Sequence, residues 1–131
     1  MATWDDVRRI ALGLPETSEV TKREGQLHWQ VRSKSFAWER PLRKSDLEAL
    51  GEAAPTGPIL GVRTPDLGAK EALIADVPAV FTTPHFDGYP AVLVELDRIE
   101  TPDLDELLVE GWLARAPKRL AAAYLHGRAP S

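Results

Sequence analysis

The chain has 131 residues, no cysteine and a formal net charge of −4, which suits a single domain spanning residues 1–131. The lack of cysteine excludes disulfides, thiolate zinc sites and cysteine nucleophiles. No apolar run approaches the roughly 20 residues of a membrane span, and the charged N-terminus is unlike a signal peptide. We therefore expect a cytoplasmic protein with no membrane partner.

The first predicted element is a helix that begins after Thr3 and ends at residues 13–15, GLP. Thr3 is a favourable N-cap residue, and the apolar residues that follow recur every three or four positions. Pro15 prevents the helix from continuing.

Two strands are predicted next, at residues 27–32 and 35–40, where LHWQVR and SFAWER alternate apolar and polar residues. The short connection Ser33-Lys34 makes them a hairpin. The alternation predicts that Phe36 and Trp38 both face the core and that the outer face is polar and partly basic.

A short helix is predicted at residues 44–51, where Ser45 and Glu48 match the capping-box pattern. A third strand at residues 59–63 follows it. A longer helix then begins near Thr64-Pro65-Asp66 and runs to about residue 75, because proline and an early acid favour the start of a helix.

The segment FTTPHFDGYP, residues 81–90, is dense in aromatic residues and prolines. Asp87-Gly88 is a typical two-residue hairpin turn with positive φ at both positions, so it would join a fourth strand that begins at Val80 to a fifth at residues 91–96. His85 then lies two residues before the turn, where we expect a hairpin residue rather than a catalyst.

Thr101 and Pro102 begin the last long helix, and residues 117–125 form a further turn or short helix. The predicted order is α-β-β-β-α-β-β-α, with the short helix inserted before the third strand. This order predicts a two-layer α+β domain with an antiparallel five-stranded sheet and helices on one face. The other face of the sheet would be exposed and available to a partner.

The sequence offers no recognisable catalytic or metal-binding pattern. Its three histidines, His28, His85 and His126, lie in different elements and form no pair with the spacing of metal ligands. No serine lies in a G-x-S-x-G turn, and no glycine-rich phosphate loop is present. We therefore assign no catalytic residue and expect neither a metal nor a cofactor.

Several motifs, taken in order, resemble those of the MmcQ/YjbR family. They are Leu14-Pro15 at the end of the first helix, Lys34-Ser35-Phe36 at the hairpin, and the stretches FTTPHFDGYPAVLVEL and LDELLVEGWLARAPKRL. The resemblance spans roughly residues 4–125. It implies an α+β fold and DNA binding by a double-wing arrangement of hairpins, with no established catalytic residues and no known cofactor.

The charge distribution agrees with this implication. Residues 22–44 carry a net charge of +5, residues 95–110 are strongly acidic, and the segment after them is basic again. We therefore predict weak, non-enzymatic binding of double-stranded DNA by the basic hairpins. The residues expected to make contact are Lys22, Arg23, Arg32, Lys34, Arg40, Arg43, Lys44, His85, Lys118 and Arg119.

The alternative interpretation is a protein- or small-ligand-binding module that uses the exposed sheet face. A partner protein or a second copy of the chain, forming a homodimer, would then dock on that face. A tryptophan exposed beside Arg40 or Arg63 would mark such an interface, since tryptophan and arginine are enriched at binding hot spots.

Overall fold

The computed structural model describes residues 1–128, apart from the side chains of Arg23 and Arg128. The helices are α1 (Trp4–Leu12), α2 (Lys44–Leu50), α3 (Leu67–Asp76), α4 (Thr101–Arg115) and α5 (Lys118–Arg128). The strands are β1 (Thr17–Thr21), β2 (Leu27–Val31), β3 (Lys34–Glu39), β4 (Ile59–Arg63), β5 (Val80–Phe81) and β6 (Ala91–Glu95). Short 3-10 turns are η1 (Arg23–Gly25), η2 (Gly51–Ala53), η3 (Pro84–Phe86) and η4 (Leu96–Arg98).

Within residues 1–128, six strands form one antiparallel sheet in the order β1-β2-β3-β4-β6-β5. The α+β class and the antiparallel sheet are as predicted, but the sheet has six strands rather than five. The additional strand is β1, which lies at the edge and pairs with β2. Its sequence TSEVT contains a single apolar residue, Val20, so no alternating pattern marks it as a strand.

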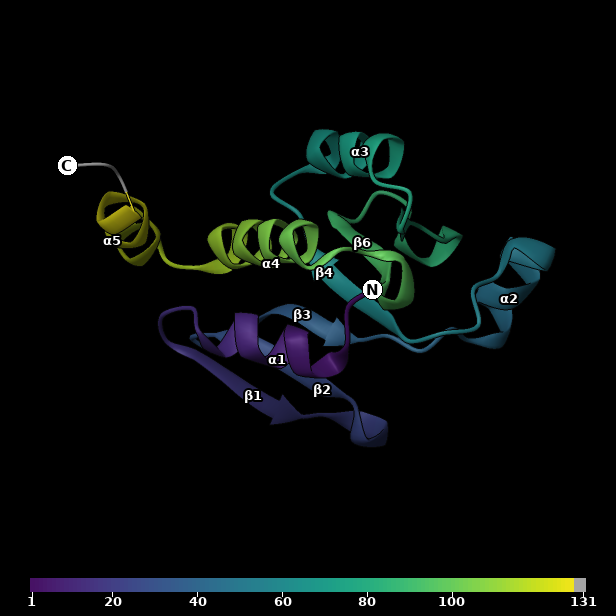
Figure 1. Cartoon of the computed structure of the whole chain (residues 1–131), viewed down its shortest axis with the longest axis horizontal. Coiled ribbons are helices and arrows are strands. Elements are labelled where there is room, and N and C mark those ends of the chain that lie inside the picture. Colours follow the sequence, from purple (N-terminus) through teal and green to yellow (C-terminus); the bar gives the residue numbers. More distant parts are fainter. Residues whose placement is uncertain (129–131) are drawn as a thin grey trace.

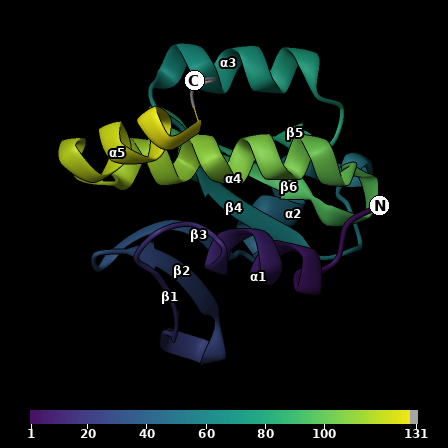
Figure 2. The same cartoon turned by 60° about the vertical axis from the view of Figure 1, so that its left-hand side comes forward.

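Helices α1 and α4 lie side by side over one face of the sheet, as Figures 1 and 2 show, and α3 packs beside strands β5 and β6. The main core between these layers includes Val7, Trp29, Val62, Leu104 and Leu108, each at most 1% exposed. Burial of each such side chain contributes about 1.5–3 kcal/mol relative to exposure. This core fixes α1 and α4 on the first face and leaves the second face for other contacts.

Strand β3 contains a bulge that the alternation of its sequence does not reveal. The register between β2 and β3 shifts next to Gln30 and leaves Phe36 as an extra residue. Phe36 and Ala37 are therefore both buried in the main core, and Trp38 packs against the cluster on the second face. The prediction that Trp38 faces the same core as Phe36 is wrong for this reason.

The second face carries a smaller buried cluster, formed by Ile59, Phe86, Ala91 and Leu93. Phe86 belongs to η3, which folds back over the β4–β6 half of this face. Trp38 lies across Gly61, where a Cβ atom would be only 2.5 Å from the indole Cε2 and Nε1 atoms. The second face is thus covered over one half and accessible over the β1–β2–β3 half, instead of being open throughout as predicted.

The turn between β2 and β3 lies one residue earlier than predicted. Its two residues are Arg32 and Ser33, with φ of 46° and 70°, and Val31 pairs with Lys34 across it. Positive φ at both positions is typical of a type I′ hairpin turn. Lys34 is therefore the first residue of β3 rather than part of the turn.

The predicted tight hairpin at Asp87-Gly88 is a longer connection instead. Asp87 has φ of −59°, Gly88 has φ of 75°, and the Tyr89 N–H donates to the Phe86 carbonyl at 3.0 Å, which fits a type II turn. Because β5 ends at residue 81, residues 82–90 form the connection to β6. His85 lies exposed within it, in η3.

The N-terminal caps agree with the prediction in α1 but not in α2. The Thr3 hydroxyl accepts the Asp6 N–H at 3.3 Å, and the Asp6 carboxylate accepts the Thr3 N–H at 2.9 Å. Helix α2 begins instead after Arg43, whose N–H donates to Asp46 at 2.8 Å. Ser45 therefore lies inside α2 and does not cap it.

Replacing Gly61 with alanine should destabilise the fold, because the new methyl group would collide with the Trp38 indole. We expect a loss of about 1–3 kcal/mol in the free energy of unfolding, measured by urea denaturation. Gly68→Ala is the matched control, since a Cβ atom there meets only Asp66 Oδ1 at 3.4 Å. An unchanged urea midpoint for Gly61→Ala would show that Trp38 does not rest on Gly61.

Candidate functional site

Several of the basic residues singled out by the sequence meet in a hollow on the second face, which we call the basic cleft. Its volume is about 610 Å³. Of the residues expected to contact nucleic acid, Lys22, Arg40, Arg43 and His85 line it. The full lining is Lys22, Gln26, His28, Ser33, Ser35, Trp38, Arg40, Arg43, His85, Phe86, Tyr89 and Arg115.

The basic cleft has uncompensated positive charge. Among the described residues, no Asp or Glu lines it, and Lys22, Arg43 and Arg115 form no ion pair. In the part of the chain that the structure describes, four buried side-chain atoms have no hydrogen-bond partner: Arg115 Nε, Arg40 Nη2, Arg63 Nε and Thr83 Oγ1. Three cations that form no ion pair favour an anionic ligand.

Arg40, in contrast, is neutralised within the protein. Its Nη2 lies 3.0 Å from Asp46 Oδ2, and both side chains are at most 5% exposed. Its Nη1 donates to the Pro41 carbonyl at 2.6 Å, and its guanidinium carbon lies 5.3 Å from the centre of the Phe86 ring. Arg40 therefore joins α2 and η3 to the end of β3, which is a different role from the phosphate contact that the sequence suggested.

The floor of the cleft is aromatic. The rings of His28 and Trp38, on the paired strands β2 and β3, are nearly parallel at 19° with centroids 6.1 Å apart. His28 Nδ1 lies 3.0 Å from Ser35 Oγ, which holds the imidazole in place. These two stacked rings and the cations line the same cleft.

A buried lysine fixes the segment that carries Phe86 and Tyr89, which form an aromatic wall of the cleft. Lys70, on α3 and 6% exposed, donates from Nζ to the carbonyls of Phe86 at 2.6 Å and Tyr89 at 2.8 Å. Burial lowers the pKa of Lys70, while the charge of Asp87 acts in the opposite direction. Arg63 Nη1 donates to the Tyr89 hydroxyl at 3.2 Å and its guanidinium lies over that ring. Together these contacts fix the segment that carries His85, Phe86 and Tyr89.

The remaining basic residues of the β2–β3 turn, β3 and α2 lie at the margin of the cleft. Arg32 makes two hydrogen bonds to Glu16, at 2.7 and 3.0 Å, so its charge is compensated. Lys34 and Lys44 are exposed, next to the lining residues Ser33 and Arg43 respectively.

The structure does not bring the basic residues of the C-terminal helix to the cleft. Lys118 and Arg119 lie on α5, which Figure 1 places at the opposite end of the molecule from α2, and they do not line the cleft. The side chain of Arg23 lies outside the described residues.

Sequence reasoning did not place Phe86, Tyr89 and Arg115 in this site. Phe86 and Tyr89 reach it because the 82–90 connection folds over the sheet. Arg115 reaches it from the end of α4, although α4 packs on the other face. The sequence signals were the density of aromatic residues in FTTPHFDGYP and the basic segment after residue 110, which includes Arg115.

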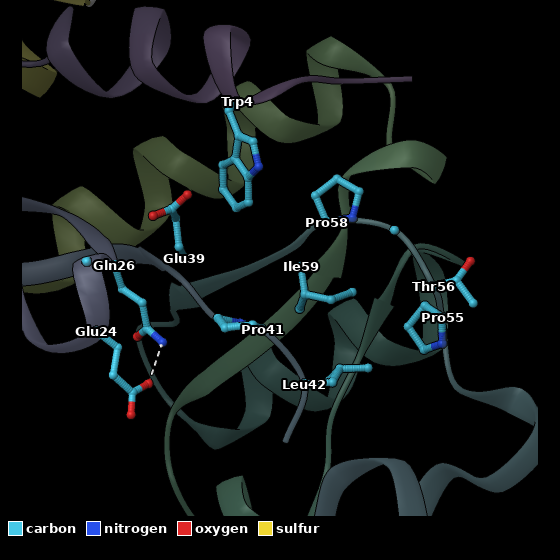
Figure 3. Close-up of a pocket in the computed structure, with 12 residues that line it drawn as sticks. Trp4, Glu24, Gln26, Glu39, Pro41, Leu42, Pro55, Thr56, Pro58 and Ile59 are labelled. Atoms are coloured by element: carbon cyan, nitrogen blue, oxygen red, sulfur yellow. Dashed lines mark hydrogen bonds between the residues drawn. The ribbon is translucent and has the colours of Figure 1, made fainter. Parts of the chain in front are cut away.

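A second hollow of about 420 Å³ lies where β3 ends and β4 begins, and we call it the Trp4 pocket. Figure 3 shows the Trp4 indole pointing down from α1 toward Pro58 and Ile59. Glu24 and Glu39 supply carboxylates to its lining, and Glu39 Oε1 also accepts the Leu27 N–H at 2.7 Å. This pocket is apolar and acidic, the reverse of the basic cleft.

Within residues 1–128, no group of three or more His, Asp or Glu side chains is gathered as metal ligands. None of the helices in that range is both long and apolar enough to cross a membrane.

Comparison with known proteins identifies the family. The YjbR family model matches residues 12–114. The chain belongs to the YjbR family. The match confirms the resemblance seen in the sequence and contains most of the lining of the basic cleft, from Lys22 to Tyr89.

The similar proteins bear on the fold and not on the function. Uncharacterized proteins of Mycobacterium bovis and Mycobacterium tuberculosis are 60% identical over 129 residues, covering 95% of this chain and 97% of theirs. The crystal structure of the Deinococcus radiodurans protein DR2400, with a DUF419 domain, has a TM-score of 0.60 at 23% identity. It covers 86% of this chain and 78% of its own, and shows that the fold is shared.

Removing the carboxylate of Asp46 should strongly destabilise this YjbR protein, because Arg40 would stay buried without a counter-charge. We expect Asp46→Asn to cost about 3–5 kcal/mol at pH 7. Burial raises the pKa of Asp46, but the Arg43 N–H and the charge and hydrogen bond of Arg40 outweigh it and hold the pKa below 3.8.

The stabilisation by Asp46 is therefore present above pH 3.8 and lost as the pH falls through the lower, folded-state pKa. Urea denaturation from pH 7 to pH 2 should show the wild type and Asp46→Asn converging at acidic pH. Asp105→Asn, at an exposed position on α4, is the control and should behave as the wild type. Equal stability of Asp46→Asn and wild type at pH 7 would contradict this role.

His28 should titrate below its ordinary value of 6.5. Burial lowers its pKa, the charge of Lys22 lowers it further, and Glu39 opposes both. Because protonation is penalised in the folded state, the contribution of His28 to stability falls as the pH drops below 6.5. An NMR titration should show the pKa of His28 rising in Lys22→Gln and unchanged in Lys118→Gln. A pKa above 6.5 in the wild type would contradict the assigned environment.

Proposed function

We propose that this YjbR protein is a non-enzymatic DNA-binding protein that uses the basic cleft. The observation that supports this most is the meeting of Lys22, Arg43 and Arg115, from three separate elements, around a hollow with no carboxylate among its described lining residues. Such cations position a nucleic acid through its phosphates.

The acidic residues of α4 lie on the other side of the sheet. Helix α4 packs against β3 and β4 through the main core, and its exposed acids Asp103, Asp105, Glu106 and Glu110 face away from that core. DNA held in the basic cleft would therefore be screened from these acids by the sheet. This removes the main electrostatic objection to DNA binding by a chain with a net charge of −4.

The expected affinity is low and depends on salt. Neutralising about three phosphates gives a slope of about −2.7 in log K against log salt, or about 40-fold weaker binding at 200 mM than at 50 mM salt. Lys34 and Lys44, exposed at the cleft margin, would add contacts to a longer DNA. We place this activity in the cytoplasm, because a chain without cysteine has no disulfide that requires an oxidising compartment.

The Trp4 pocket supports a second candidate function, the binding of a small ligand or of a protein partner, including a second copy of the chain. Its apolar wall, formed by Trp4, Leu42 and Ile59, lies beside the carboxylates of Glu24 and Glu39. That combination suits a ligand with an apolar body and a positive charge. It does not suit DNA, since both carboxylates would repel phosphates.

The DNA-binding proposal is tested by charge reversal with a matched control. We expect the double variant Lys22→Glu and Arg43→Glu to bind a fluorescent 20-base-pair duplex about tenfold more weakly at 100 mM salt, measured by anisotropy. The control, Lys118→Glu with Arg119→Glu on α5, changes the net charge by the same amount and should retain most of the affinity. Equal losses in both double variants, or no binding of the duplex or of its separated strands by the wild type at 50 mM salt, would overturn the proposal.

A further inference from the structure

We propose that the basic cleft binds unpaired nucleotides, with a base stacked on Trp38 and the neighbouring phosphates held by the cations of the rim. This inference rests on the proposed function, since it requires nucleic acid to enter the cleft. It adds that the bound nucleotides are unpaired. The shared chemistry is an exposed base joined to a phosphate, which single-stranded DNA and single-stranded RNA both provide.

The floor of the cleft is suited to a base. The Trp38 indole packs directly on the backbone of Gly61, which has no side chain. The ring of His28 on β2 is stacked with this indole. Ser35, hydrogen-bonded to His28, and Gln26 also line the cleft, and their polar groups can bind the edges of a base. Aromatic rings on a sheet, beside polar groups, are a common platform for stacked bases.

The rim is suited to a flexible backbone. Lys22 follows β1, Arg43 precedes α2 and Arg115 ends α4, so the cations reach the cleft from three separate parts of the chain. The unsatisfied Nε of Arg115 would gain an acceptor from a phosphate oxygen. Tyr89, 43% exposed and held by Arg63, adds a second aromatic ring at the wall.

The same geometry disfavours a duplex. Proteins read the major groove with an α-helix or a two-stranded ribbon that enters it. Here α1 and α4 cover the opposite face of the sheet, and the cleft is lined by residues of the strands and of the 82–90 connection and not by a projecting helix. The faces of paired bases are stacked inside the duplex, so they cannot reach Trp38. Only an unpaired base can meet the floor and the rim together.

The experiment compares three labelled probes of one sequence at 100 mM salt: a 12-nucleotide DNA strand, the same strand as RNA, and the 12-base-pair DNA duplex. We expect at least one single strand to bind about tenfold more tightly than the duplex, because stacking on an aromatic ring adds to the phosphate contacts. Tighter binding of the DNA strand or of the RNA strand identifies which nucleic acid the cleft prefers. Equal binding of the two means that the protein does not distinguish the 2′-hydroxyl.

Two substitutions of Trp38 test the stacking itself. Trp38→Leu should lose about tenfold in single-strand affinity and leave duplex affinity unchanged, whereas Trp38→Phe, which keeps an aromatic ring, should retain most of the single-strand affinity. Tyr89→Leu, at an exposed position, provides a second variant should Trp38→Leu fail to fold. Single-strand affinity unaffected by both Trp38→Leu and Tyr89→Leu would overturn the inference.

NMR of the wild-type protein tests the contact with Trp38 without any substitution. In NMR spectra of ¹⁵N-labelled protein, the indole N–H signal of Trp38 should shift when the single strand is added, while those of Trp29 and Trp112, at most 1% exposed, should not. An unshifted Trp38 signal, or duplex binding as tight as single-strand binding, overturns the inference and leaves the DNA-binding function standing. Absence of binding to all three probes overturns both.

Discussion

The bulge at Phe36 is the constraint on which the second face of this protein depends. One extra residue in β3 places Phe36 and Ala37 in the main core and turns Trp38 to the opposite side of the sheet. There the indole requires the bare backbone of Gly61. With strict alternation, Trp38 would be part of the main core and the basic cleft would have no aromatic floor. The core and the site are therefore set by the same local irregularity.

The sequence predicted most of the fold because its signals are local. Each signal acts within a few positions of the chain: Thr3 caps a helix, Pro15 ends it, and residues 27–31 alternate as a strand. Together these signals predicted the α+β class correctly. The bulge, the edge strand β1 and the 82–90 connection were not predictable, because strand pairing and packing over the sheet decide them and leave no local pattern. The cleft was predicted only in part for the same reason: Arg115 reaches it through packing of α4, which no pattern near residue 115 reveals.

The acids of α4 and the unpaired cations of the basic cleft lie on opposite sides of the sheet. The acids of α4 lie outside the first face, whereas Lys22, Arg43 and Arg115 gather at the second. Two buried interactions fix the segments beside these cations. They are the ion pair of Arg40 with Asp46 and the hydrogen bonds of Lys70 to the carbonyls of Phe86 and Tyr89. A net charge of −4 thus conceals one basic surface, and the value for the whole chain is a poor guide to its partner.

The most direct test is to locate the residues that nucleic acid contacts. Ultraviolet cross-linking of the protein to a short oligonucleotide, followed by mass spectrometry of the linked peptides, locates that contact. We expect cross-links to the aromatic residues of the basic cleft, Trp38, Phe86 and Tyr89. Cross-links confined to α5, or to Trp4 in the acidic pocket, would contradict the claim that the second face of the sheet is the binding surface.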